Sequence, residues 1–398
     1  MISITSHRQG AILNHNHGIE TPQSLTVKIE GISEGGFPVT VNDIPAEMNG
    51  RSFSCAIELK EKFNTVTAGV VTPFGSFCQS VVLVWDKASF KRCNFYIDDH
   101  SFLFTDLAKE RPKSAFDHFY LKGLKTIHDK YGFKVTLNAF YHNDHHDFNL
   151  CDMPDIWKNE FIDNSDWLKF SFHSKSEFPD RIYAEATAEE FGADWEQVQN
   201  EIVRFAGEES YIAPCVIHWA NVHPAVAQEA IKRGMTCYSK ALRLRVMGGP
   251  SLADRQKGGN MQNIEKRSMS GEDKAMNTEG LKLHYGFQEE DSFLSKNYGY
   301  YDPLLNLFFF QCRGVCCNLV PFEHIKPRMD ATFEAAAKSG VEFFNCASHE
   351  QYTFPYYPNY IPDHMARLEE AARCMVEDGN CKPCFFSEGI LGNTAWGK

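Results

Sequence analysis

The chain has 398 residues, of which 43% are hydrophobic and 23% charged, so it is long enough for two or three domains with buried cores. Its formal net charge of −12 and the lack of a long basic stretch exclude the electrostatic footprint of a nucleic-acid-binding protein. No window approaches 18 consecutive apolar residues, so we expect no membrane span.

The first residues and the cysteines bear on the cellular compartment. The opening segment MISITSHRQGAILNHNHG lacks the apolar core of a signal peptide, so we expect a cytoplasmic protein, or a secreted one if a leader was removed. The 13 cysteines are scattered and odd in number, which favours free thiols. Cys312, Cys316 and Cys317 would form a zinc site with Cys381 and Cys384 only if the two groups met in space. The oligomeric state is left open.

Residues 1–88 are expected to form a small all-β sandwich. Hydrophobic and polar residues alternate with period two, and turn residues recur about every 10 positions with no helical pattern between them. The alternating segments are 24–30, 38–42, 53–59, 65–71 and 80–85. Residues 64–68 with Gly75 resemble a pattern of the immunoglobulin-like modules attached to carbohydrate-active enzymes, and this resemblance implies an immunoglobulin-like domain.

Residues 89–398 show strand-like runs that alternate with amphipathic helices, which predicts an α/β domain with a mostly parallel sheet. The expected strands are 93–97, 134–140, 167–172, 212–218, 236–239, 281–285, 308–313 and 342–347. The expected helices are 115–130, 195–206, 224–233, 328–339 and 361–377. Eight strands with interleaved helices predict a barrel of the (β/α)7–8 kind. Residues 245–280 are polar and rich in glycine, which predicts an insertion near the mouth of the barrel.

Polar residues gather where the predicted strands end. The carboxyl ends of barrel strands meet at one mouth, where catalytic groups lie. The residues at these ends are Asp98, Asp99, the loop 142–147, His173, Glu177, His218, His223, His349 and Glu350. Each has a purely structural alternative, because paired aspartates also form turns and histidines are also found buried or solvated.

Asp99 and His173 are expected to bind one divalent ion. A mixture of nitrogen and oxygen ligands suits a catalytic ion that keeps one open position, and Zn²⁺ is the ion we expect. Glu177 or His218 would complete the ligand set. Glu177 follows His173 by four positions, so the two side chains would face one way if the segment were helical.

Four places in the sequence resemble motifs of the polysaccharide deacetylase superfamily, also known as the NodB-homology or carbohydrate esterase proteins. Asp98-Asp99 is similar to the family's Thr-Phe-Asp-Asp-Gly motif, and the segment 173–177 to its His-Ser/Thr-x-x-His motif. Pro214 is placed like the proline of the Arg-x-Pro-Tyr motif, and His349 like the last catalytic histidine. The resemblance spans roughly residues 90–398 and implies that family's barrel.

The resemblance also implies an activity, the deacetylation of an N- or O-acetylated carbohydrate with a bound divalent metal. By this resemblance Asp98 is the general base, Asp99 and His173 bind the metal, and His349 is the general acid. The sequence departs from the family where Glu177 replaces a histidine and Ile212 an arginine, so the chain resembles a divergent branch.

Further residues near the predicted mouth are expected to contact the substrate. These are Trp219, Glu350 and Tyr352, and Glu350 would also orient His349. Two other functions stay open. One is a non-catalytic glycan-binding protein with a degenerate site, and the other is a glycoside hydrolase that uses two carboxylates such as Glu323 and Glu350.

Overall fold

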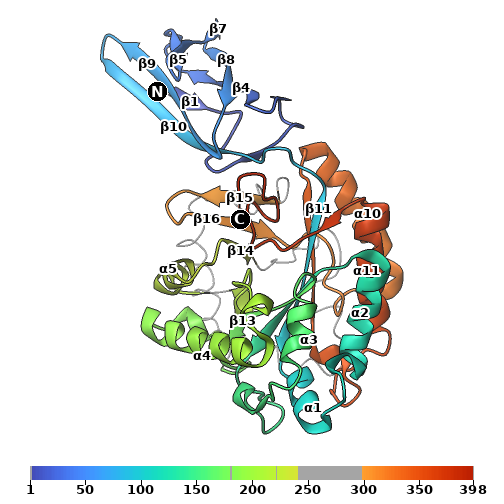
Figure 1. Cartoon of the computed structure of the whole chain (residues 1–398). Helices are drawn as coiled ribbons and strands as arrows, with labels where there is room; N and C mark the ends of the chain where they lie inside the picture. The colour runs from blue at the N-terminus through green and yellow to red at the C-terminus, as the bar shows by residue number, and fades with distance from the viewer. Residues whose placement is uncertain (1, 180–181, 221, 241–297, 398) are drawn as a thin grey trace.

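The computed structural model describes residues 2–179, 182–220, 222–240 and 298–397. Figure 1 shows an all-β part at the top, formed by the first 85 residues, and an α/β part below it. The predicted insertion at 245–280 and the predicted strand at 281–285 lie outside the described residues.

The all-β part consists of two sheets with a hydrophobic core of their own. One sheet has the order β1-β4-β8-β7, with β3 beside β4, and the other has the order β2-β10-β9-β5-β6. Its strands are β1 (Ile2–Ile4), β2 (Ile12–Leu13), β3 (Ile19–Glu20), β4 (Leu25–Ser33), β5 (Val39–Val41), β6 (Ile44–Pro45), β7 (Glu47–Asn49), β8 (Ser52–Leu59), β9 (Phe63–Thr72) and β10 (Gly75–Trp85).

The predicted alternation is the reason why these strands form a sandwich. Along β4, Leu25, Val27 and Ile29 are buried, whereas Lys28 and Glu30 are exposed. Because successive side chains of a strand point to opposite faces, each sheet has one apolar face that must pack on the other sheet. All five predicted segments overlap strands. The immunoglobulin-like topology of residues 1–88 stays a prediction.

The α/β part contains a parallel sheet with the order β13-β12-β11-β17, and β18 also pairs with β11. These strands are β11 (Arg92–His100), β12 (Val135–Phe140), β13 (Leu168–Ser174), β17 (Phe343–His349) and β18 (Lys382–Pro383). Every residue of β11 and β12 is buried, as expected of parallel strands that are covered on both faces. The predictions of strands at 93–97, 134–140, 167–172 and 342–347 are confirmed.

A second sheet is formed by β14 (Cys237–Lys240), β16 (Leu307–Gln311) and β15 (Gly299–Asp302). Irregular backbone hydrogen bonds connect it to the first sheet on both sides. Ile212 donates to Phe170 in β13, and Ser239 in β14 donates to Cys215. After β16, the segment 314–317 exchanges hydrogen bonds with β17. These bonds link the two sheets in a ring, and the (β/α)7–8 barrel stays a prediction.

The prediction of a strand at 212–218 is wrong. The segment makes one isolated parallel bridge, between Tyr211 and Phe170, and then enters a short 3₁₀ turn at His218–Ala220. Pro214 has no N–H group to donate to a neighbouring strand, which interrupts regular pairing. Trp219 then takes a positive φ of 65°, which turns the chain out of the extended conformation.

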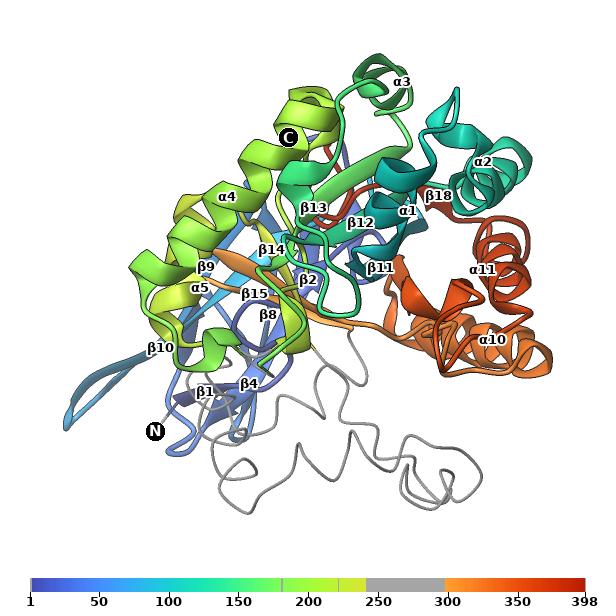
Figure 2. The same ribbon diagram turned by 90° about the horizontal axis from the view of Figure 1, so that it is seen from below.

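Helices cover the outside of the parallel strands. They are α1 (Phe102–Glu110), α2 (Phe119–Tyr131), α3 (Lys158–Asp163), α4 (Ala188–Ala206), α5 (Pro224–Lys232), α10 (Phe322–Ser339) and α11 (His364–Arg373). In Figure 2, α4 and α5 lie on one side of β11 to β13, and α10 and α11 on the other. The five predicted helices are confirmed with shifted ends, whereas α1 and α3 were not predicted. No helix in the described part of the chain is long and apolar enough to cross a membrane.

The all-β part is attached at the amino-terminal ends of the parallel strands (Figure 1). Residues near the carboxyl terminus make this contact. The indole Nε1 of Trp396 donates to the carbonyl oxygen of Trp85 at 2.8 Å, and Asn393 donates to Asp86 at 2.7 Å. Arg92, which is fully buried, pairs with Asp86 at 3.0 Å. The carboxyl ends of the strands, which carry the predicted site, lie at the opposite end.

Candidate metal centre

A bulge at the end of β11 brings Asp98 and Asp99 to the same site. Neighbouring residues of a regular strand point to opposite faces, but the pairing of β11 with β12 shifts between Ile97 and His100. Asp99 sits in this irregularity with a φ of 67°, in the left-handed region that aspartate tolerates better than most residues. Both carboxylates therefore approach His173, Asp98 at 4.0 Å and Asp99 at 3.1 Å.

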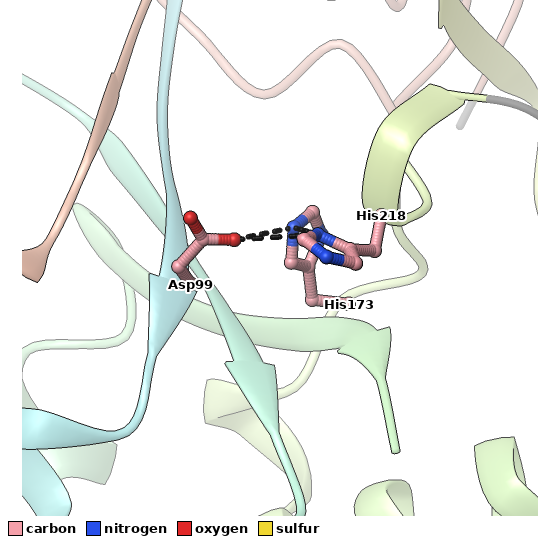
Figure 3. A group of neighbouring side chains, drawn as sticks. All are labelled: Asp99, His173 and His218. Carbon is pink, nitrogen blue, oxygen red and sulfur yellow. Dashed lines mark hydrogen bonds and ion pairs between the residues drawn. The ribbon is translucent and has the colours of Figure 1, made fainter. Parts of the chain in front are cut away.

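Asp99, His173 and His218 form a compact group of metal-ligating atoms (Figure 3). Oδ1 of Asp99 lies 3.1 Å from Nε2 of His173 and 3.4 Å from Nδ1 of His218. The two ring nitrogens are 3.2 Å apart. Two ligand atoms bonded to one tetrahedral zinc ion stand roughly 3.3 Å apart, given bonds of about 2.0–2.1 Å. The three atoms therefore have the spacing and the chemistry of a zinc ligand set.

His218, and not Glu177, is the third member of this group. The residues after β13 are not helical, so the i, i+4 relation that would have turned Glu177 towards His173 does not apply. The carboxylate of Glu177 instead lies 2.7 Å from Nε2 of His145, which belongs to the loop 142–147. Only the backbone carbonyl of Glu177 approaches the group, 3.2 Å from Nε2 of His218.

The electrostatics of the group favour a charged Asp99. Burial opposes ionisation, but the imidazoles of His349, His173 and His218 outweigh it and hold the pKa of Asp99 well below its usual range. Burial likewise opposes a charged His218, but the Asp99 carboxylate outweighs it and raises the pKa of His218. An anionic ligand that stays ionised at neutral pH is what a divalent cation requires.

Asp98 has a different environment from Asp99. Burial raises the pKa of Asp98, and the neighbouring histidines offset this only in part. The side-chain amide of Asn138, on β12, donates a hydrogen bond to Oδ1 of Asp98 at 2.7 Å. Asn138 was not predicted as a site residue, although a polar side chain in a fully buried strand such as β12 is a signal for a buried hydrogen bond.

His349 lies at the end of β17, where it is paired with Asp98 of β11. Its Nε2 is 4.0 Å from Oδ2 of Asp99, and its Nδ1 donates to Oδ1 of Asn318 at 3.0 Å. About a third of the side chain, 34%, is exposed, which leaves it open to a bound molecule. Asn318 lies in a loop after β16 and carries no sequence signal for this contact. It holds His349 in the way that had been expected of Glu350.

The prediction that Glu350 contacts substrate and orients His349 is contradicted by its burial, since it is 0% exposed. Its two carboxylate oxygens accept hydrogen bonds from the backbone amides at the start of α1, those of Ser101, Phe102 and Leu103, each at 2.8 Å. Burial raises the pKa of Glu350 to about 8, and the three hydrogen bonds, which act in the opposite direction, offset this only in part. Glu350 therefore caps α1 from the neighbouring strand end.

We expect Glu350→Ala to lower the free energy of unfolding by about 3 kcal/mol, because three buried amides lose their acceptor at once. Urea denaturation followed by circular dichroism measures this change. Glu334→Ala on α10, where the side chain is 73% exposed, is the control and should stay within about 0.5 kcal/mol of the wild type. Equal stability of the two variants would contradict a capping function for Glu350.

Two aromatic side chains that were predicted to bind substrate flank the histidines. The ring of Trp219, 42% exposed, lies 5.6 Å from that of His218. The ring of Tyr352 lies 6.3 Å from that of His349. A contact with a substrate stays a prediction for both.

The cysteines do not contribute to the group. All 13 are free. Among the described residues, no group with the spacing of metal ligands contains a cysteine, so the zinc site that Cys312, Cys316, Cys317, Cys381 and Cys384 would have formed is not supported. Cys316 lies beside the site, where its Sγ is 3.9 Å from Nδ1 of His349.

Comparisons with known proteins define no family. No family model and no curated protein matches the chain. Two solved structures from Bacteroides fragilis, described as a "putative alpha-galactosidase/melibiase" and a "putative alpha-galactosidase", are each 11% identical, with TM-scores of 0.19 and 0.24. The alignments cover 60% and 94% of this chain, and 56% and 78% of those chains.

A third structure is the beta-glucuronidase of Parabacteroides merdae with glycerol in its active site. It is 9% identical, with a TM-score of 0.21, and the alignment covers 87% of this chain and 47% of that one. The chain thus spans about half the length of the first and third of these proteins. At such TM-scores the similarity defines neither a fold family nor a function.

Proposed function

We propose that the protein is a metal-dependent hydrolase that deacetylates an N- or O-acetylated carbohydrate. One observation carries this proposal. Three ligand atoms, from Asp99, His173 and His218, lie 3.1–3.4 Å from one another. The carboxylate of Asp98 lies 4.0 Å from His173, and the imidazole of His349 lies 4.0 Å from Asp99. A metal ligand set beside a candidate base and a candidate acid is an arrangement that suits amide or ester hydrolysis.

The residues present fit a divalent ion. Two imidazoles and one carboxylate are the ligand types of catalytic zinc, and all three side chains are buried. Three protein ligands leave a position for water or substrate. A divalent ion held there supplies a Lewis acid that polarises the scissile carbonyl and makes water a better nucleophile at neutral pH.

Asp98 is suited to take a proton from the attacking water. Its pKa, raised by burial, lies nearer to neutrality than that of an ordinary aspartate, which makes the carboxylate a stronger base. The hydrogen bond from Asn138 fixes the carboxylate. In the polysaccharide deacetylase family an arginine orients the base, and in this chain Ile212 stands at the position of that arginine. We propose that Asn138 supplies the orienting contact instead.

His349 is suited to donate a proton to the leaving amine or alkoxide. Its Nδ1 is bound to Asn318, so its Nε2 is directed towards Asp99. The exposed Trp219 and the partly buried Tyr352 beside the two histidines offer rings on which a sugar can stack.

The two alternatives are less well supported. A glycoside hydrolase that uses Glu323 and Glu350 is incompatible with a Glu350 that is fully buried and bonded to three amides. A glycan-binding protein with a degenerate site was suggested by the missing arginine, but the Asn138 contact compensates for that loss.

Acetate release from N- and O-acetylated oligosaccharides by zinc-loaded protein tests the proposal. We expect acetate to appear without new reducing ends, and to stop when a chelator removes the metal. New reducing ends without acetate would instead identify a glycoside hydrolase. Binding of the oligosaccharide with neither product would identify a glycan-binding protein.

A further inference from the structure

A second group of metal-ligating side chains lies on the outer side of α1. Asp106 and Glu110 are one helical turn apart on α1, and His118 is the residue that precedes α2. The nearest ligand atoms of the three side chains all lie within 4.8 Å of one another. Glu110 is exposed, Asp106 is partly buried and His118 is only 3% exposed, so the group opens to solvent on one side.

The imidazole of His118 points to a ligand. Both ring nitrogens are buried, and neither has a hydrogen-bond partner among the described residues. The ring packs against Phe119 at 4.7 Å and Phe354 at 6.1 Å, so two of its neighbours are apolar. Buried polar nitrogens are nearly always paired in folded proteins, and an unpaired imidazole directed at two carboxylates is therefore unusual.

The separation of His118 and Asp106 suits a shared metal ion better than a direct bond. Nε2 of His118 is 3.6 Å from Oδ2 of Asp106, which is too long for a hydrogen bond. It is close to the roughly 3.3 Å between two ligands of one tetrahedral zinc ion. The other oxygen of Asp106 accepts a hydrogen bond from the hydroxyl of Tyr356 at 2.9 Å, which orients Oδ2 towards His118.

We propose that Asp106, Glu110 and His118 bind a second divalent ion, of the borderline type that accepts both imidazole and carboxylate ligands, as Zn²⁺ does. The ion is structural. It joins the last turn of α1 to the start of α2, and through Tyr356 it joins both to the segment that follows β17. The helix held in this way is the one that follows Asp98 and Asp99 directly in the chain.

Titration of metal-free protein with Zn²⁺ alone, followed by calorimetry, tests this second site. We expect the wild type to bind two ions. Asp106→Asn, which keeps an oxygen for Tyr356, and Glu110→Gln, a change of an exposed side chain, should each lose one ion and leave the protein folded. Asp330→Asn on α10, an exposed acid paired with a lysine, is the matched control and should keep both ions.

The two sites are distinguished by Asp99→Ala. If Asp99→Ala retains one ion and the variant combined with Asp106→Asn retains none, the second site is supported. If the wild type binds a single ion that Asp106→Asn loses and Asp99→Ala keeps, the second site is again supported. That result would contradict the proposed metal centre at Asp99. If the Asp106→Asn and Glu110→Gln proteins both bind two ions with the affinity of the wild type, the proposal of a second site is wrong. It is also wrong if the wild type binds one ion only and loses it with Asp99→Ala.

Discussion

Asp99→Ala is expected to abolish metal binding at the group that Asp99 forms with His173 and His218, and hydrolysis with it. Asp99 is the only anionic ligand of that group, and its carboxylate touches both histidines. Loss of the ion removes several kcal/mol of transition-state stabilisation, on the order of 1000-fold in rate. Measuring bound zinc in the Asp106→Asn background, where one site should remain, gives the clearest result.

His145→Gln is the matched control for Asp99→Ala. His145 also lies near the carboxyl ends of the parallel strands and pairs with a carboxylate, that of Glu177, but it is not a member of the ligand group. We expect it to keep the metal and most of the activity. Full zinc occupancy of the Asp99→Ala protein would show that the ligand assignment is wrong.

Asp98→Asn is expected to keep the metal and lose the chemistry. The amide has nearly the shape of the carboxylate but cannot accept a proton, and Asp98 is not among the three ligand atoms. Removal of a general base lowers the rate by about 100- to 10,000-fold. Parallel measurements of zinc content and acetate release separate this result from that of Asp99→Ala.

Asp144→Asn controls for the loss of a carboxylate close to the site. Asp144 accepts hydrogen bonds from the backbone amides of Glu177 and Phe178, and an asparagine oxygen can accept them as well. We expect nearly unchanged activity. An Asp98→Asn protein that hydrolyses as fast as the wild type would mean that Asp98 is not the base and that the proposed mechanism does not apply to this chain.

The residues at strand ends were the most predictable part of the site. The last residues of three parallel strands include Asp98, Asp99, His173 and His349. The apolar runs of these strands are evident in the sequence, and the carboxyl ends of parallel strands meet at one edge. His218 was predicted as an alternative ligand for the wrong structural reason. It reaches the group from a 3₁₀ turn and not from the end of a strand.

What could not be predicted depends on contacts between segments far apart in the chain. A carboxylate at a strand end, such as Glu350, is typical of a catalytic residue. Only the position of α1 in the structure shows that Glu350 caps a helix. Asn318 reaches His349 from a loop without periodicity. The second group was missed because no helix was predicted over α1, so the one-turn spacing of Asp106 and Glu110 was not recognised.

The contact between the two parts of the molecule has a consequence for biosynthesis. Asn393 and its partner Asp86 are 307 residues apart, and Trp396 covers Trp85 across a similar span. At the usual pace of translation, about 5–20 residues per second, the sandwich leaves the ribosome roughly 15 to 60 s before its docking partners exist. During that interval the nascent sandwich depends on its own core, because the contacts of Trp85 with Trp396 and of Asp86 with Asn393 have not yet formed.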